Sequence, residues 1–425
     1  MTYAEAREFL SRLPRFEVKP GLERTRWLLD GLGRPETVVR AVHVAGTNGK
    51  GSVVAMLDAV LRAAGYRVGR FTSPEVLDYR DRIAIDGEWI SEKAFADLVE
   101  RLEPLINSMA DVPTEFEVLT SMALRWFADQ AVDVAVVEVG LGGRFDATNL
   151  VRPVLGILTS VDYDHTHLLG ESLEAIAWEK AGIAKRGIPL VVGGLPPAAE
   201  SVVRSVCEDI NAPCEDAREI ALEREDGPEP PARYRVSGEG LPSRIELPLL
   251  GGYQKGNLRL ALRAVQHLRG AGFELPDGAV IRGLGGVQWP GRFEIVSRRP
   301  DVILEGAHNV AGARALVADL ERYVPTRARR HLLFGVLSDK DAAGMARVLF
   351  PHFSRVWLTQ SSSPRALPAR ELSGHAAELS VPHTWYDSVR EAWATACSAL
   401  QPNDVLIVAG SLTVVAEARK QMERK

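Results

Sequence analysis

The sequence predicts an α/β protein of two doubly wound domains, of which the first is larger and has a mostly parallel sheet. Short continuous apolar runs, typical of strands covered on both faces, alternate with helix-forming runs along most of the chain. A glycine-rich turn joins the first such strand to a helix. The length of 425 residues, with 46 % apolar and 25 % charged residues, fits a globular protein of two or three domains.

The glycine-rich turn lies in residues 43–53. Its glycines leave backbone N–H groups bare, and with the positive end of the following helix these can surround a phosphate. Lys50 would add a charge for the outer phosphates, and Ser52 a hydroxyl for a phosphate-bound magnesium ion. The usual pattern, G-x-x-x-x-G-K-S/T, is not strictly met, because only two residues separate Gly46 from Gly49 and the serine comes one place late. An ordinary glycine-rich turn is the alternative.

Composition argues against several kinds of partner. The net charge is −5 with no basic patch, so nucleic acid is not expected. The first 16 residues are too charged for a secretory signal, and no apolar run is long enough to span a bilayer. Three scattered cysteines, Cys207, Cys214 and Cys397, do not form a disulfide framework or a zinc site. A cytoplasmic location with no membrane partner is therefore expected.

Polar side chains follow three further predicted strands. Glu138 lies at the end of the apolar run 132–139, and because a buried unpaired carboxylate is costly, it should meet a cation. Ser73 ends another strand, although a simple turn residue is the alternative. His165 follows a third strand beside two aspartates, as a metal ligand or as a capping or surface histidine. Ligands gather at the carboxyl ends of strands in open α/β sheets, so these residues and the glycine turn are expected at one edge.

Several helical positions leave structural and functional interpretations open. Thr114 precedes acidic residues and is a candidate helix cap, and Phe116 is more often a core residue than a stacking platform. Asn257 either caps a helix or reaches the nucleotide. A lysine in a helix is nearly always solvated, and spacing alone does not single out Lys180.

The second half of the chain predicts a small appendage and a second domain. Residues 224–248 change to short alternating runs with prolines, which suggests a small antiparallel appendage. The predicted domains are 1–296 and 297–425. The second domain lacks a phosphate-loop lysine motif, so we expect it to complete a site through residues 305–309 and 335–341, which follow its strands.

Several motifs resemble, in their order along the chain, those of bacterial folylpolyglutamate synthases, which are often also dihydrofolate synthases, within the Mur ligase superfamily. They span residues 43 to 341, and their joint order is far more specific than any single motif. The matching pieces are Gly46-Thr47-Asn48-Gly49-Lys50-Gly51-Ser52, Thr72-Ser73-Pro74, Thr114 with Phe116-Glu117, Glu138 to Asn149, Asp164-His165, Glu179 to Ile183, Pro290-Gly291-Arg292, Gly306-Ala307-His308-Asn309 and Asp339-Lys340-Asp341.

The resemblance implies an ATP-dependent amide ligase with a phosphate-loop ATPase domain and a smaller, C-terminal Rossmann-like glutamate-ligase domain. The carboxylate of a pterin-linked acceptor takes the γ-phosphate of ATP, and L-glutamate attacks the acyl phosphate. We expect both tetrahydrofolate and dihydropteroate as acceptors, with a monofunctional enzyme as the alternative. A ligase of cell-wall precursors, or a phosphate-loop NTPase that drives conformational change without ligation, are further alternatives. The implied partners are these small molecules, acting on a monomer.

The resemblance also implies the residues of the site. ATP would be bound by Gly46, Thr47, Asn48, Gly49, Lys50, Gly51, Ser52, Asn257, Arg292, Glu305 and His308. One of two Mg²⁺ ions would be held by Ser52, Ser73 and Glu138, and the second by His165 and a carbamylated Lys180. The acceptor pocket would comprise Arg82, Thr114, Phe116, Asp146 and Ala147. The catalytic groups would be Lys50, Glu138, His165 and Lys180.

Three positions depart from the family pattern. Glu75 stands where a histidine usually follows Ser-Pro, which leaves the role of that position open. Glu305 replaces an aspartate, keeping the charge with a longer reach, and Val310 replaces a proline.

Overall fold

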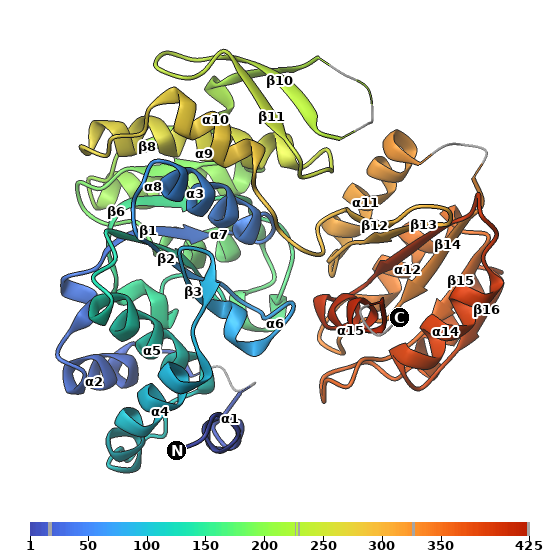
Figure 1. Cartoon of the computed structure of the whole chain (residues 1–425), viewed down its shortest axis with the longest axis horizontal. Helices are drawn as coiled ribbons and strands as arrows, with labels where there is room; N and C mark the ends of the chain where they lie inside the picture. The colour runs from blue at the N-terminus through green and yellow to red at the C-terminus, as the bar shows by residue number, and fades with distance from the viewer. Residues whose placement is uncertain (16–18, 226, 228–229, 325–327, 423–425) are drawn as a thin grey trace. The chain divides into compact units, whose positions relative to one another are not determined.

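The computed structural model describes residues 1–15, 19–225, 227, 230–324 and 328–422 (Figure 1). The chain forms two compact units. The first comprises Met1–Arg224, Tyr234–Glu246 and Gly256–Val287, and the second comprises Glu225–Arg233, Leu247–Lys255 and Gln288–Lys425. The domain boundary between residues 296 and 297 stays a prediction.

The first unit is organised around an eight-stranded sheet with the strand order β4-β3-β2-β5-β1-β6-β7-β8. β3 and β4 pair antiparallel at one end, and the other six strands are parallel. The strands are β1 (Arg40–Ala45), β2 (Val68–Phe71), β3 (Ile83–Ile85), β4 (Glu88–Trp89), β5 (Val134–Glu138), β6 (Arg152–Leu158), β7 (Leu190–Val192) and β8 (Cys214–Asp216). The mostly parallel α/β sheet predicted from the apolar runs is confirmed.

Helices pack against both faces of this sheet (Figure 1). Ala41, Ala135 and Val137 point to one face and share a core with helices α1, α2, α4 and α5, whereas α3 contacts β1, β2 and β5. The helices of this part of the chain are α1 (Tyr3–Ser11), α2 (Glu23–Gly31), α3 (Lys50–Ala63), α4 (Glu92–Asn107), α5 (Glu115–Asp129), α6 (Thr166–Leu169), α7 (Leu173–Ala181), α8 (Pro197–Asp209), α9 (Gln254–Gly270) and α10 (Asp277–Gly285).

The parallel register brings four strand ends to one edge of the sheet. Glu138 of β5 pairs with Val44 of β1, and Leu158 of β6 pairs with Ala45 of β1. On the other side of β5, Phe71 of β2 pairs with Val137. The loops that follow β1, β2, β5 and β6 therefore all leave from the same edge, as the sequence predicts.

The sequence predicts one of two small antiparallel features and misses the other. The antiparallel appendage is confirmed as a three-stranded sheet of β9 (Ala221–Arg224), β10 (Ala232–Ser237) and β11 (Arg244–Leu247). The hairpin of β3 and β4 is not among the elements predicted above, because β4 has only two residues and both are exposed. Such a strand carries too few residues for an alternating pattern.

The second unit holds a six-stranded sheet with the order β12-β13-β17-β14-β15-β16. Its strands are β12 (Glu294–Ser297), β13 (Asp301–Leu304), β14 (Arg330–Phe334), β15 (Arg355–Leu358), β16 (His383–Trp385) and β17 (Val405–Ala409). Its helices are α11 (Val310–Tyr323), α12 (Ala342–Leu349), α13 (Ala369–Glu378), α14 (Val389–Ala399) and α15 (Leu412–Met422). β12 is antiparallel to β13, and the remaining pairs are parallel. Within the described ranges, no helix is both long enough and apolar enough to cross a membrane.

Candidate active site

The glycine turn after β1 forms a loop that opens directly into α3. Gly46 and Gly49 have φ angles of 147° and 90°, a region that favours glycine, and Gly49 is the N-cap of the helix. The first turn of α3 holds Lys50, Gly51 and Ser52, so their N–H groups belong to the positive end of a 14-residue helix. This local geometry suits an anion such as a phosphate.

The loop is fastened to the residues that follow β6. The Thr159 hydroxyl donates to the carbonyl of Asn48 at 2.6 Å, and the Asn48 N–H donates to Ser160 Oγ at 2.9 Å. The Thr47 N–H donates to the Ser160 carbonyl at 2.9 Å. Thr159 and Ser160 were not among the predicted site residues, and their position directly after a buried strand was the signal that could have found them.

Two lysines converge on one carbonyl oxygen of the loop. Lys50 Nζ donates to the Gly46 carbonyl at 3.0 Å and to the Thr47 carbonyl at 3.3 Å. Lys180, on α7, donates from Nζ to the same Gly46 carbonyl at 3.2 Å. Lys180 is only 4 % exposed, so it is not the solvated helix lysine that its type alone suggests. Two lysine side chains therefore meet at one turn of the loop.

A buried carboxylate stands at the same edge of the sheet. Glu138 is 4 % exposed, and its Oε2 accepts from the backbone N–H of Ser73 at 3.4 Å. Ser52 is also buried, in the first turn of α3. Their hydroxyl and carboxylate oxygens are hard donors of the kind that Mg²⁺ prefers. In the described part of the chain, no group of three or more His, Cys, Asp or Glu side chains is arranged around a common point.

His165 has a local conformation that is rare for a side-chain-bearing residue. Its φ is 49°, in the left-handed region, and it is the N-cap of α6. Its N–H donates to Asp164 Oδ1 at 2.9 Å, and its Nε2 lies 3.8 Å from the same oxygen. Strained backbone of this kind is often retained at functional sites.

Asn257, on α9, lies directly over the phosphate loop. A Cβ atom added to Gly49 would lie 2.4 Å from Asn257 Oδ1, so only glycine leaves room for this amide. The structure thus brings Asn257 to the N-terminus of α3. Of the two alternatives for Asn257, the helix cap does not apply because α9 already begins at Gln254, and the contact with a nucleotide stays a prediction.

Two of the predicted acceptor residues, Arg82 and Phe116, lie against each other. Arg82 lies over the ring of Phe116, with Cζ 5.8 Å from the ring centroid, and its Nη1 is 3.6 Å from Glu75. Glu75 also pairs with Arg15 at 2.9 Å, so the residue that departs from the family pattern holds two arginines. Phe116 packs closely under Gly140, where an added Cβ would lie 2.5 Å from the ring.

Asp146 and Ala147 belong to the loop after β5, where buried polar side chains are linked by hydrogen bonds. Asp146 accepts from the N–H groups of Leu141 at 2.9 Å and Thr148 at 3.0 Å, and burial raises its pKa. The Thr148 hydroxyl lies 2.8 Å from Nε2 of His43 on β1, and burial lowers the pKa of His43 to about 3. Ala147 begins the short helix that Asp146 caps.

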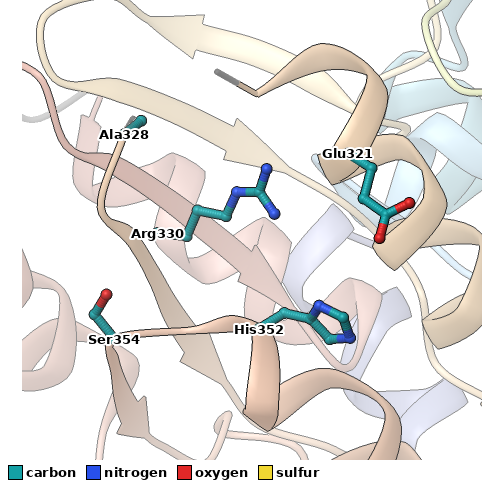
Figure 2. Close-up of a pocket in the computed structure, with 5 residues that line it drawn as sticks. All are labelled: Glu321, Ala328, Arg330, His352 and Ser354. Carbon is teal, nitrogen blue, oxygen red and sulfur yellow. The ribbon is translucent and has the colours of Figure 1, made fainter. Parts of the chain in front are cut away.

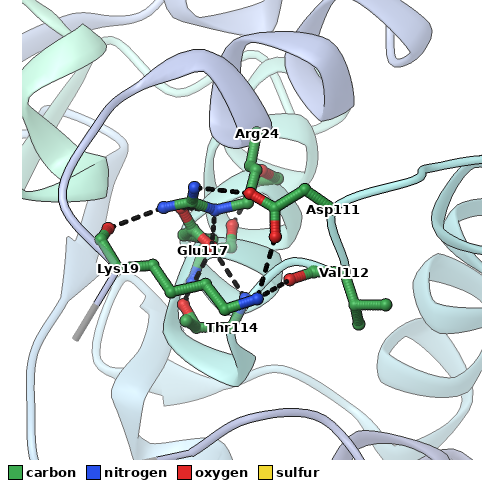
Figure 3. A network of polar contacts seen from close by, with 7 residues as sticks. Lys19, Arg24, Asp111, Val112, Thr114 and Glu117 are labelled. Atoms are coloured by element: carbon green, nitrogen blue, oxygen red, sulfur yellow. Dashed lines mark hydrogen bonds and ion pairs between the residues drawn. The ribbon is translucent and has the colours of Figure 1, made fainter. Parts of the chain in front are cut away.

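Thr114 has a structural role within a network that fixes α5 (Figure 3). Its hydroxyl accepts from the N–H of Glu117, and the Glu117 carboxylate accepts from the N–H of Thr114 at 2.7 Å, which completes a capping box. Arg24 of α2 donates to Glu117 at 3.0 Å and to Asp111 at 2.8 Å. Arg24 was not predicted, because its partners lie about 90 residues away in the sequence.

Three predicted nucleotide contacts lie in the second unit. Arg292 Nη1 and His308 Nδ1 both contact the carbonyl of Gly306, at 3.3 Å and 2.8 Å. The buried Glu305 accepts from the Tyr253 hydroxyl at 2.9 Å and from the Phe293 N–H at 2.8 Å, both at Oε2. Burial raises the pKa of Glu305 to about 7, although the positive charge of Arg292 opposes this shift.

A pocket elsewhere in the second unit contains none of the predicted residues (Figure 2). It is lined by Glu321, Ala328, Arg330, His352 and Ser354. Arg330 begins β14 and Ser354 precedes β15, so the pocket lies at the amino ends of these strands. Ligands of open α/β sheets bind at the carboxyl ends, and the Arg330 guanidinium already donates to the carbonyls of Leu320 and Val324.

Family models identify the class of enzyme to which this fold and site belong. Residues 44–189 match the Mur ligase middle domain, and residues 291–412 match the Mur ligase glutamate ligase domain. Mur ligases are ATP-dependent ligases, so the chain is an enzyme that uses ATP.

Known proteins narrow this class further. The dihydrofolate synthase/folylpolyglutamate synthase of Bacillus subtilis is 35 % identical over 429 residues, which cover 99 % of each chain. The crystal structure of Mycobacterium tuberculosis folylpolyglutamate synthase complexed with ADP and AMPPCP matches with a TM-score of 0.91 and 33 % identity, over 100 % of this chain and 98 % of that one. The structure of E. coli FolC in complex with DHPP and ADP matches with a TM-score of 0.88 and 31 % identity, over 100 % of this chain and 98 % of that one. The chain belongs to the folylpolyglutamate synthase/dihydrofolate synthase family.

Proposed function

We propose that this enzyme joins L-glutamate to a folate-type acceptor at the expense of ATP. The acceptor carboxylate attacks the γ-phosphorus, the bond to the β-phosphate oxygen breaks, and ADP leaves. The amine of L-glutamate then attacks the acyl carbon of the resulting acyl phosphate, loses a proton and expels phosphate. Tetrahydrofolate and dihydropteroate are both proposed acceptors, which the bifunctional name of the Bacillus subtilis relative supports.

The observation that carries this proposal is the contact of Lys50 with the Gly46 carbonyl, beside the N-terminus of α3. Phosphoryl transfer depends above all on positioning and on neutralising charge at the phosphates. Lys50 is held at the first residue of α3, so its ammonium and the helix N-terminus act on the same anion. We propose Gly46, Thr47, Asn48, Gly49, Gly51, Asn257, Arg292 and His308 as further nucleotide contacts.

We propose that Ser52, Ser73 and Glu138 hold a magnesium ion, with His165 serving a second. Mg²⁺ usually keeps several waters and takes only one or two carboxylates besides phosphate oxygens, so this sparse set of oxygen donors fits it. When bound, the ion neutralises charge that develops on the transferred phosphate. Glu138 is the buried carboxylate that would face this ion, and the Ser73 N–H donates to it.

Lys180 is the proposed site of carbamylation. Its neutral amine would attack CO₂ and release a proton, which turns the cation into a carboxylate able to face a metal ion. This reaction needs a neutral amine, and the Lys180 side chain is 4 % exposed. Mass spectrometry of intact protein under bicarbonate, without acid, would test this modification as a gain of one CO₂.

The acceptor would bind against Arg82, Phe116, Asp146 and Ala147, with Thr114 acting through the cap of α5. We further propose domains of 1–296 and 297–425, a cytoplasmic location, and a monomer with no nucleic-acid or membrane partner. Light scattering coupled to size-exclusion chromatography tests the monomer.

The experiment that tests the function is an ADP-release assay with and without L-glutamate. Release that needs both L-glutamate and tetrahydrofolate or dihydropteroate supports the proposal. ADP release that depends on neither L-glutamate nor the acceptor would favour a phosphate-loop NTPase without ligation. ADP release that depends on a cell-wall precursor would favour another Mur ligase. Activity with only one of the two folate-type acceptors would favour a monofunctional enzyme.

A further inference from the structure

Glu305 is directed into the protein, away from the role of a direct nucleotide ligand that the family pattern suggests. It follows directly after β13, and it is 4 % exposed. Its Oε2 receives two hydrogen bonds, from the Tyr253 hydroxyl at 2.9 Å and from the Phe293 N–H at 2.8 Å. A carboxylate oxygen with two donors is committed to them, since it has two lone pairs to offer.

The two donors come from different segments of the second unit. Tyr253 lies in residues 247–255, which belong to this unit although the chain before and after them belongs to the first. Phe293 lies just after residue 288, where the chain enters this unit for the last time. One carboxylate oxygen therefore fastens both connecting segments to the end of β13.

Further contacts fasten these two segments within the second unit. The Gly252 N–H donates to Asp319 Oδ1 of α11 at 2.6 Å, which fixes the first segment a second time. The Gly291 N–H donates to Glu294 at 2.9 Å, and Arg419 of α15 pairs with Glu294 at 2.7 Å. The turn that carries Arg292 is thus held on both sides.

Arg292 is the residue whose position depends on this arrangement. It precedes Phe293, and its Nη1 donates to the Gly306 carbonyl, the residue next to Glu305. A Cβ on Gly306 would lie 2.4 Å from Arg292 Nη1, so the guanidinium packs directly against this glycine. His308 Nδ1 contacts the same carbonyl at 2.8 Å. Movement of the Phe293 backbone would shift Arg292, and movement of Glu305 would shift the neighbouring Gly306 carbonyl that Arg292 and His308 share.

From this geometry we infer that Glu305, with Tyr253, is a positioning residue that sets where Arg292 and His308 meet the nucleotide. The inference rests on the proposed function of Arg292 and His308. The charged and titratable groups that act on Glu305 are Arg292, Tyr253 and Asp319.

The test is the binding of the non-hydrolysable analogue AMPPCP with magnesium, measured by isothermal titration calorimetry on the full chain. Tyr253→Phe removes only the donor oxygen, and we expect the dissociation constant for AMPPCP to rise about tenfold or more, as for losing one hydrogen bond to a charged group. Glu305→Gln should weaken AMPPCP binding to a similar degree. Because the two residues act through one contact, the double variant should have a dissociation constant no higher than that of the single variant that binds more weakly. Tyr386→Phe, a half-buried tyrosine of the same unit, is the matched control and should bind as wild type.

A second readout separates positioning from general loss of structure. Because protonation of Glu305 weakens its charge-assisted bonds, wild-type affinity should fall as the pH drops through about 7, and Glu305→Gln should lack this step. Michaelis constants for L-glutamate and the acceptor should not change. The inference is overturned if folded Tyr253→Phe binds AMPPCP as wild type does, or if the pH profiles of wild type and Glu305→Gln coincide. A wild-type chain that binds no AMPPCP would instead overturn the proposed nucleotide site.

Discussion

Replacing Gly46 by alanine should disable the phosphate loop through one steric contact. An added Cβ would lie 1.9 Å from Thr159 Oγ1, about 1.5 Å inside ordinary van der Waals contact. That hydroxyl donates to the carbonyls of Asn48 at 2.6 Å and Ala45 at 3.2 Å. Either the hydroxyl or the loop must move too far for the hydrogen bond to Asn48 to persist, so the loop is no longer held to the residues after β6. The φ of 147° adds backbone strain for alanine.

The expected effect on catalysis follows from the size of that displacement. A misplacement of about 1 Å in a phosphoryl-transfer site costs about 100-fold, so kcat/KM for ATP should fall by about this factor. Gly65→Ala is the matched control: its φ is also positive, at 93°, but no heavy atom lies within 4 Å of the added Cβ. It should lose about 1–2 kcal/mol of stability and keep its activity. ADP release under varied ATP, with circular dichroism to confirm folding, makes the comparison. A folded Gly46→Ala enzyme with wild-type kcat/KM for ATP would refute this reasoning.

Three further predictions concern the lysine pair, a buried histidine and the α5 network. Lys180→Met should lower kcat about 100-fold or more, with only partial recovery in excess magnesium, whereas the exposed Lys93→Met should not; equal rates would contradict the role of Lys180. His43 stays neutral in the folded protein to about pH 3 but takes up a proton near pH 6.5 when unfolded, so stability should fall by about 1.4 kcal/mol per pH unit below 6.5. Urea denaturation at several pH values should show a shallower slope for His43→Gln, and an unchanged slope would count against this. Arg24→Met leaves the buried Glu117 without its cation and should cost about 3 kcal/mol, measured by urea denaturation, with Lys93→Met costing less than about 1 kcal/mol.

The sheet edge could be predicted from the sequence because its signals are local. The apolar runs before Gly46 and at residues 132–139 mark buried strands, and parallel strands direct their carboxyl ends to one edge. Glu138 at the end of such a strand therefore had to lie beside the loop. The short β4 escaped prediction because two exposed residues carry no pattern.

Side-chain direction could not be predicted, because it depends on contacts far apart in the sequence. Lys180 reaches Gly46 across 134 positions, and nothing in its helix indicates burial. The direction of Glu305 depends on a tyrosine 52 positions earlier. The cap that the sequence suggests for Thr114 is present in its bonds to Glu117, because a capping signal is local, whereas its contact with substrate stays a prediction. The roles proposed for individual site residues stay predictions.

The most direct test of the account is ADP release by the purified enzyme as L-glutamate is varied, with ATP, magnesium and either tetrahydrofolate or dihydropteroate present. We expect release to rise from near zero and saturate with L-glutamate, with one glutamate incorporated for each ADP. ADP release at the same rate without L-glutamate, and no product extended by glutamate, would contradict it.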